Sequence, residues 1–202
     1  ADVSQPDSII AAGQACLERQ GLPDVVIANA GISVGVDTAE RADLDTMARV
    51  FATNNLGLAA TFHPFISAMT QRGSGRLVGI GSVAGIRGLP GHGAYCASKA
   101  AVISYCESLR GELRGSGVRV VTISPGYVDT PLTRENRYRM PFLMTPEAFA
   151  ESAFKAIETG SSYRVIPWQM GVAAKLLRLL PNPWFDRLLQ GRPRKHRQPP
   201  SS

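Results

Sequence analysis

Short apolar segments alternate with longer stretches of mixed polarity along most of this chain. The apolar runs have the length of strands and occupy residues 25–28, 76–81, 118–123 and 163–166. The stretches of helix length occupy residues 7–20, 44–71, 95–114 and 145–159. Such short apolar runs are typical of parallel strands buried on both faces, and the helices between them have the length of crossover connections. The pattern therefore predicts an α/β fold with a doubly wound parallel sheet.

Two further apolar helical stretches follow residue 167, with Pro181-Asn182-Pro183 between them. Seven basic residues and one acidic residue come after Gly171, whereas the part before has fifteen of each sign, so the formal net charge of +6 belongs to the C-terminal part. We divide the chain into an α/β domain over residues 1–167, an amphipathic helical extension over residues 168–190 and a disordered basic tail over residues 191–202.

The composition excludes several classes of protein. With 202 residues, 44% of them hydrophobic and 19% charged, the chain can form one sizeable core and is unlike a disordered, collagen-like or coiled-coil protein. No apolar run approaches the roughly 20 residues of a membrane-spanning helix, and no signal peptide is visible. Three cysteines indicate a reduced, cytoplasmic protein, three scattered histidines predict no metal site, and the neutral body predicts no nucleic-acid partner.

Small and polar residues follow three of the predicted strands. Asn29, Ala30 and Gly31 follow the first strand, residues 81–85 the second, and residues 124–126 the third. Ligands of doubly wound sheets bind at the carboxyl ends of the strands, where small residues let the backbone approach them. We therefore expect the functional site at these three strand ends, although a simple turn is an equally good interpretation of residues 29–31 alone.

Tyr95 and Lys99 form the most informative pair in the sequence. They are four residues apart on a predicted helix and so share a face. A tyrosine hydroxyl is a poor base at its usual pKa near 10, and a nearby ammonium can lower that pKa by about two to three units in a partly dry site. We expect Lys99 to act on Tyr95 in this way, and Ser82 to hold a carbonyl or alkoxide oxygen beside the tyrosine. A pair of surface residues is the alternative interpretation.

Four spaced motifs resemble those of the short-chain dehydrogenases/reductases. They are Asn29-Ala30-Gly31, Ser82 thirteen residues before Tyr95, Tyr95-Cys96-Ala97-Ser98-Lys99, and Pro125-Gly126-Tyr127-Val128-Asp129-Thr130. Asn54 lies where that family has an asparagine three residues before a glycine, with Asn55 as the adjacent alternative. The resemblance extends from Asp2 to about Pro167. It implies a Rossmann-like dehydrogenase domain, NAD or NADP as the cofactor, and an oxidoreductase that interconverts an alcohol and a ketone or aldehyde.

The resemblance also implies a role for each residue of the site. In the catalytic set, Tyr95 exchanges a proton with the substrate oxygen, Ser82 holds that oxygen, Lys99 also binds the nicotinamide ribose, and Asn54 holds a water of the proton relay. The cofactor-binding residues besides Tyr95 and Lys99 are Asp2, Val3, Asn29, Ala30, Gly31, Pro125, Gly126, Val128 and Thr130. The substrate-binding residues are Ser82, His92, Tyr127, Met140 and Phe142, with His92 interpreted as a pocket-edge or solvated histidine.

One part of the family pattern is absent near Ala1. The family begins with two strand–helix units and a glycine-rich turn, T-G-x-x-x-G-x-G, that binds pyrophosphate, whereas this sequence starts where the family has the end of its third strand. Two interpretations are open. The chain is a piece of a longer enzyme, or it is a truncated member that binds dinucleotides poorly and serves as a non-catalytic binding or scaffold protein. The residue that distinguishes NAD from NADP falls in the same absent part.

The segment from Pro131 to Met144 is expected to form the lid of the substrate site. Its apolar residues favour an apolar alcohol or carbonyl compound as the small-molecule substrate, whereas Arg134, Arg137 and Arg139 allow an anionic group at the rim. A homodimer or homotetramer is expected. For the C-terminal apolar stretches, core packing or a subunit interface is one interpretation. The other is a peripheral membrane contact in which the cations meet anionic headgroups.

Overall fold

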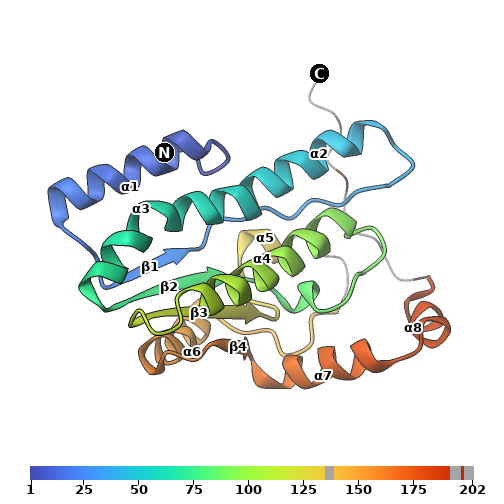
Figure 1. Ribbon diagram of the computed structural model, residues 1–202. Helices are drawn as coiled ribbons and strands as arrows, with labels where there is room; N and C mark the ends of the chain where they lie inside the picture. Colours follow the sequence, from blue (N-terminus) through green and yellow to red (C-terminus); the bar gives the residue numbers. More distant parts are fainter. Residues whose placement is uncertain (135–138, 192–196, 198–202) are drawn as a thin grey trace.

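The computed structural model describes residues 1–134, 139–191 and 197. Within them lies a parallel sheet formed by β1 (Val25–Ala28), β2 (Gly75–Ile80), β3 (Val118–Pro125) and β4 (Tyr163–Ile166), in the order β1-β2-β3-β4 (Figure 1). All neighbouring strands pair in parallel. The predicted parallel sheet is confirmed, and each strand begins and ends within about two residues of its expected position, an offset normal for strand boundaries.

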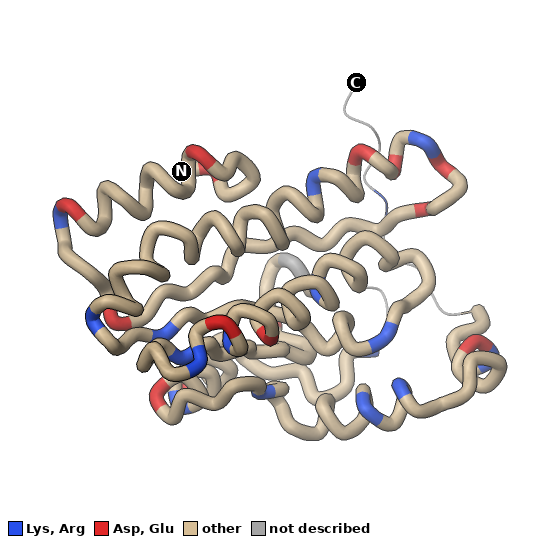
Figure 2. Tube along the Cα trace, in the orientation of Figure 1, with Lys and Arg blue, Asp and Glu red and all other residues tan. Residues whose placement is uncertain are grey.

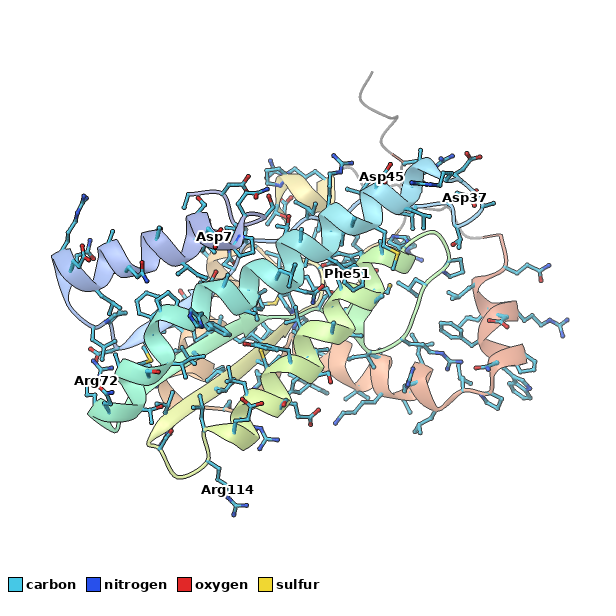
Figure 3. The ribbon with its side chains drawn as sticks, turned by 45° about the horizontal axis from the view of Figure 1, so that its top comes forward. Asp7, Asp37, Asp45, Phe51, Arg72 and Arg114 are labelled. Atoms are coloured by element: carbon cyan, nitrogen blue, oxygen red, sulfur yellow. The ribbon has the colours of Figure 1, made fainter. Side chains whose placement is uncertain are left out.

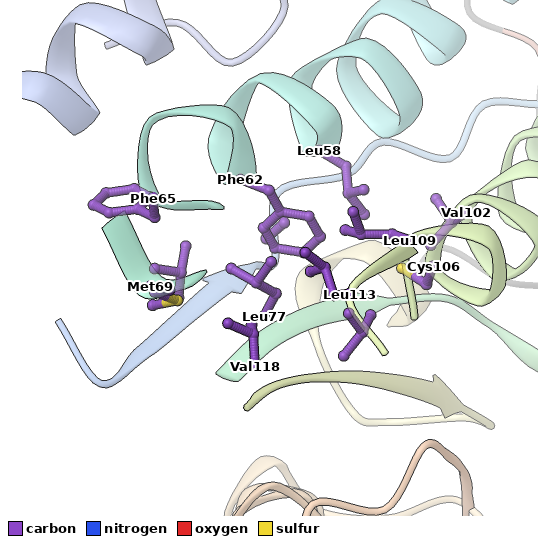
Figure 4. Close-up of a cluster of buried hydrophobic side chains, with 13 residues drawn as sticks. Leu58, Phe62, Phe65, Met69, Leu77, Val102, Cys106, Leu109, Leu113 and Val118 are labelled. Carbon is purple, nitrogen blue, oxygen red and sulfur yellow. The ribbon is translucent and has the colours of Figure 1, made fainter. Parts of the chain in front are cut away.

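Helices cover both faces of the sheet. α1 (Pro6–Gln20), α3 (Gly57–Arg72) and α4 (Gly93–Glu112) pack on one face, and α6 (Pro146–Thr159) packs on the other (Figure 1). Figure 4 shows the larger core, in which Phe62, Met69 and Leu77 are fully buried between α3 and the sheet. Burial of such side chains stabilises the fold by roughly 1.5–3 kcal/mol each, so the sheet is a rigid base for the residues at its edge.

The stretch that we predicted as one helix over residues 44–71 is a succession of helical segments. α2 (Ala42–Phe51) continues into a π-helical turn (Ala52–Leu56) and then into α3. Figure 3 labels Phe51, at the point where α2 ends and the turn begins. A π turn contains one extra residue and occurs frequently at functional sites. Here it contains Asn54 and Asn55, whose amides both reach Ser98 of α4.

Shorter elements complete the described fold. A 3-10 turn (Val83–Gly85) follows β2, and α5 (Pro131–Arg134) follows β3. The two C-terminal apolar stretches are α7 (Trp168–Leu179) and α8 (Asn182–Leu189). None of the described helices is long and apolar enough to cross a membrane.

The first residues differ from their expected conformation. Asp2 and Val3, expected at the end of a strand, lie at a turn that leads into α1. Asp2 Oδ1 accepts hydrogen bonds from the backbone N–H and the hydroxyl of Ser4, at 2.9 and 2.8 Å. An aspartate that bonds the chain two residues ahead favours a turn over a strand, which is the local reason for the difference.

The basic tail also differs from expectation at one residue. Arg197, predicted to be disordered, forms an ion pair with Asp43 in which Nε lies 2.8 Å from Oδ2. The Asp43 carboxylate is buried and also accepts the Asp37 N–H at 2.6 Å. A buried carboxylate needs such partners, and this need explains the placement of Arg197. The remainder of the predicted tail beyond Gly191 lies outside the described residues.

Candidate active site

The ends of β1 and β2, the π-helical turn and α4 meet at the carboxyl edge of the sheet. Lys99 Nζ donates a hydrogen bond to the carbonyl of Ile80, the last residue of β2, at 2.8 Å. Gly31, just after β1, lies against the same group. A Cβ at this position would be 3.3 Å from Lys99 Nζ and 3.3 Å from Asn54 Oδ1. The absence of a side chain at Gly31 therefore leaves space beside the ammonium, as expected where a backbone approaches a ligand.

Asn54 uses its whole side-chain amide inside the protein. Its Oδ1 accepts the N–H of Ile32 at 2.8 Å, and its Nδ2 donates to the carbonyl of Ile32 at 3.0 Å and to Ser98 Oγ at 2.9 Å. Ser98 Oγ in turn donates to the carbonyl of Tyr95 at 2.8 Å. The alternative residue, Asn55, donates to the carbonyl of Ser98 at 2.9 Å. Both asparagines hold α4, and Asn54 additionally holds the segment after β1.

Ser82 joins the end of β2 to Tyr95. Its Oγ caps the 3-10 turn by accepting the N–H of Ala84 at 3.1 Å, and its hydroxyl also hydrogen bonds with the side chain of Tyr95. Lys99 Nζ lies 5.9 Å from the centre of the Tyr95 ring, one helical turn away. The structure thus brings Ser82, Tyr95 and Lys99 together, and Asn54 is connected to them through Ser98.

Burial dominates the electrostatics of this cluster. Lys99 is 5% exposed, and the desolvation of its ammonium lowers its pKa from 10.5 to about 8. Burial raises the pKa of Tyr95, and its hydrogen bond with Ser82 offsets part of this shift. Our expectation that Lys99 lowers the pKa of Tyr95 below its usual value is therefore wrong for this structure. The ammonium is directed at the Ile80 carbonyl, and the desolvation of the phenol is the larger effect.

The residues after β3 form a loop along the same edge. The N–H of Gly81, beside Ser82, donates to the carbonyl of Ile123 in β3 at 2.7 Å. Gly126 donates its N–H to Ile166 of β4 at 2.8 Å. Of the predicted cofactor residues, Gly126, Val128 and Thr130 lie on this loop, and Pro125 is the last residue of β3. It is held by a parallel bridge between Val128 and Met144 and by a hydrogen bond from the Thr130 N–H to Thr133 Oγ1, at 3.0 Å.

The other predicted residues are spread more widely. His92 immediately precedes α4 and is buried, with Nδ1 3.1 Å from the carbonyl of Pro90, so the solvated interpretation is wrong. Asn29 and Ala30 are exposed after β1. Tyr127 and Met140 are half-buried, and Phe142 is exposed.

Asp2 and Val3 contact other parts of the chain than the Ser82, Tyr95 and Lys99 cluster, and one predicted residue lies outside the described part of the chain. Val3 lies against α3, close to the backbone of Gly57, and Asp2 bonds Ser4. Asp2 also donates its N–H to Ser8 Oγ in α1 at 3.1 Å, so the described contacts of the two residues are with the amino-terminal turn, α1 and α3. Arg137, named for the rim of the lid, lies outside the described residues. Among the residues that the structure does describe, no group of three or more His, Cys, Asp or Glu side chains could hold a metal ion.

Sequence reasoning missed two side chains that organise this region. Ser98 links Asn54 to Tyr95, and its position in the Tyr-x-x-x-Lys motif, three residues after the tyrosine, placed it on the right helical face. Arg87 lies in the loop between Ser82 and Tyr95 and reaches across to α7 and α8. A single arginine in a glycine-rich loop has no local pattern that indicates such a partner.

The chain is similar to known short-chain dehydrogenases. The family model of the short chain dehydrogenases matches residues 1–140. An uncharacterized oxidoreductase of Myxococcus xanthus is 42% identical over 185 residues, which are 92% of this chain and 73% of that protein. This chain belongs to the short-chain dehydrogenase family. The ketoacyl reductase HetN of Nostoc is 34% identical, over 89% of this chain and 63% of its own length.

A solved structure shows the same fold. A short chain dehydrogenase from Burkholderia cenocepacia, crystallised in complex with NADP, superposes with a TM-score of 0.79 at 21% identity, over 95% of this chain and 77% of that one. The resemblance on which the sequence reasoning relied is therefore confirmed at the level of family and fold. The protein is an oxidoreductase of this family.

Proposed function

We propose that this protein interconverts an alcohol and a ketone or aldehyde with NAD or NADP as its cofactor. The observation that carries the proposal is the convergence of Ser82, Tyr95 and Lys99 at the carboxyl edge of the sheet. Ligands of doubly wound sheets bind at this edge. The relatives named as an oxidoreductase and as a ketoacyl reductase support the same reaction class.

The residues at this edge fit a dinucleotide, which when bound supplies a hydride to the substrate carbon or accepts one from it. The backbone of residues 29–31 is exposed, and the missing side chain of Gly31 leaves room beside Lys99 Nζ. We infer that Lys99 holds the nicotinamide ribose there and that Pro125, Gly126, Val128 and Thr130 border the nicotinamide. The NADP named with the Burkholderia structure supports this class of cofactor.

Tyr95 is the residue that exchanges a proton with the substrate oxygen in this proposal. Its raised pKa keeps the hydroxyl protonated at neutral pH, so it is prepared to give a proton to a carbonyl oxygen in the direction of reduction. Ser82, already hydrogen bonded with Tyr95, holds that oxygen. Lys99, with a pKa of about 8, is mostly cationic at pH 7, so its ammonium can donate hydrogen bonds to the nicotinamide ribose.

Asn54 is a positioning residue for the segment after β1 and for α4. Its amide is engaged with Ile32 and Ser98, so it holds the segment after β1 against α4. A carbonyl oxygen has two lone pairs, and the Ile32 carbonyl uses one of them for Asn54 Nδ2. We infer that the second lone pair binds the relay water that the family resemblance assigns to Asn54.

The lid favours an apolar substrate. Phe142 and Leu143 are exposed, and Met140 is half-buried, close in sequence to the Val128–Met144 bridge. Arg134 lies on the same segment, but its Nε is 2.8 Å from Asp129 Oδ1. This ion pair neutralises the cation, so Arg134 contributes little to binding an anionic substrate.

A turnover assay tests the proposal. The chain is mixed with NADH or NADPH and a panel of apolar ketones and aldehydes, and oxidation of the cofactor is followed by its absorbance. Tyr95→Phe should lower turnover at least about 100-fold, because general acid catalysis contributes 10²–10⁴-fold. Tyr105→Phe, an exposed tyrosine on the same helix, is the matched control and should leave turnover unchanged.

Substantial turnover by Tyr95→Phe would refute the assigned role. No oxidation of either cofactor by a folded protein that carries the glycine-rich turn ahead of Ala1 would instead favour the alternative, a non-catalytic binding or scaffold member of the fold. We also propose, from the family resemblance, a homodimer or homotetramer in the cytoplasm, which light scattering and cell fractionation would test.

A further inference from the structure

The outer sides of α7 and α8 present large apolar side chains to solvent. The four on α7 recur at the spacing of one helical face, and the two on α8 are one turn apart. These six residues, called the apolar face below, are Trp168, Val172, Leu176, Leu179, Trp184 and Leu188. Their exposed fractions lie between 46% and 79%. An apolar surface of this extent marks a contact site, whereas single exposed apolar residues are ordinary.

The packing of α7 determines which of its sides faces outward. Gly171 and Ala174 are buried, and a Cβ at Gly171 would lie 3.0 Å from Cβ of Val165, so α7 lies directly on β4. On α8, Phe185 and Leu189 are the buried side chains. Both helices lie at the margin of the molecule in Figure 3. The apolar face therefore cannot turn inward unless α7 separates from the sheet.

Arg87 holds the two helices in this arrangement. Its Nη1 donates to the carbonyls of Leu177 and Leu180, the latter at 2.8 Å, and its Nη2 donates to Asn182 Oδ1 at 3.1 Å. Its guanidinium also lies 3.7 Å from the centre of the Phe185 ring. One side chain thus connects the loop after Ser82, the end of α7 and the inner side of α8.

The charges beside the apolar face indicate what covers it. α7 contains Lys175 and Arg178, both exposed, and no acid, whereas α8 contains Arg187 and Asp186 (Figure 2). In a symmetric dimer the same patch meets itself, so the three cations of α7 and α8 would face a patch whose two helices contain one carboxylate, Asp186. Anionic headgroups, by contrast, would attract these cations.

We propose that the apolar face binds the surface of an anionic lipid bilayer. The helices, of 12 and 8 residues, would lie in the interface, with apolar side chains between the headgroups and Lys175, Arg178 and Arg187 against the phosphates. Tryptophan is enriched at this depth of a membrane, and the face has one on each helix. Each cation near such a surface strengthens binding about fivefold, so the contact is reversible and sensitive to salt. This inference is independent of the proposed reaction.

Intrinsic fluorescence gives a direct test. The chain has two tryptophans, and both belong to the apolar face, so their emission reports on this face alone. The full chain is titrated with vesicles of phosphatidylcholine, with or without phosphatidylglycerol. With phosphatidylglycerol at low salt, we expect a blue shift and quenching by brominated acyl chains, both reversed by added salt. Vesicles of phosphatidylcholine alone should have a much smaller effect.

Variants separate the apolar and the charged contributions. The double variant Lys175→Glu/Arg178→Glu should bind anionic vesicles at least about 25-fold more weakly in co-sedimentation, since two favourable charges are lost. Leu179→Ser, at the most exposed position of the face, should also weaken binding. Phe154→Ser, an exposed apolar residue on α6, and Arg110→Glu, an exposed cation on α4, are matched controls that should bind as the parent does.

Three results would overturn the proposal. The first is an emission spectrum that anionic vesicles do not change. The second is an equal loss of binding in the control variants, which would show that general charge or hydrophobicity is responsible. The third is that the protein does not bind vesicles but forms a dimer in light scattering, and that Leu179→Ser dissociates this dimer. That result would assign the face to a second copy of the protein.

Discussion

Replacing Arg87 by methionine should loosen the corner between α7 and α8 and leave the sheet intact. Arg87 donates to the carbonyls of Leu177 and Leu180 and stacks on Phe185. Partly buried hydrogen bonds contribute about 1 kcal/mol each, and a cation–π contact contributes about 0.5–1 kcal/mol. The exposed bond to Asn182 adds little. Because methionine keeps part of the apolar contact of the arginine stem, we expect a loss of about 2–3 kcal/mol.

Hydrogen exchange measures this loss where it occurs. The corner lies at the end of the described helices, so the loss should appear as local opening of the last turn of α7 together with α8 rather than as global unfolding. A change of about 2–3 kcal/mol lowers the protection of the amides from the last turn of α7 through α8 roughly 30- to 150-fold. The amides of β2 and β3 should keep their protection, and Arg110→Met, an exposed arginine on α4, is the control. Unchanged protection in α8, or an equal loss across β3, would refute the reasoning.

Two further predictions concern the buried polar groups. Asn54→Ala removes the partner of the Ile32 N–H and carbonyl and the donor that Ser98 Oγ accepts, and it should lower the free energy of unfolding by about 3–4 kcal/mol in urea, against about 1 kcal/mol for Asn55→Ala. For Lys99, folding lowers the pKa from 10.5 to about 8, so the unfolded chain binds the extra proton between these pH values. Its burial should therefore cost about 3 kcal/mol below pH 8, and this cost should vanish as the pH rises through 10.5. The difference in unfolding free energy between the chain and Lys99→Met, measured across this range, should change by that amount, and a constant difference would contradict it.

The sheet could be predicted because the signals that mark each strand lie within a few residues of one another in the sequence. Each strand is a short apolar run between turn residues, and helical stretches separate the strands along the chain. The π-helical turn could not be predicted, because α and π segments share nearly the same apolar pattern. Its extra residue brings Asn54 and Asn55 to Ser98, more than 40 residues away in the chain. The π-helical turn is explained by its contacts with α4, which the sequence pattern of the turn does not show.

The site shows the same division between local and distant information. The spacing of Tyr95 and Lys99 was sufficient to place both on one face of α4. Their electrostatics depend on what surrounds that face, and this was not visible in the sequence. The carbonyl of Ile80 takes the ammonium, and burial raises the pKa of the phenol. A prediction made from the pair alone therefore had the wrong sign.

One short loop connects the two proposed surfaces. Ser82 caps its first turn beside Tyr95, and Arg87, five residues later, holds the corner between α7 and α8. The apolar face and the candidate active site are therefore attached to the same backbone segment, which ends at His92 before α4. Arg87 donates to the backbone carbonyls of Leu177 and Leu180. Every residue has such a carbonyl, so this link between the loop and the end of α7 does not depend on the side chains at these two positions. If both proposals hold, a bilayer bound at the apolar face would be connected through Arg87 to the loop that begins at Ser82, so binding of the membrane and the position of Ser82 would depend on the same short segment.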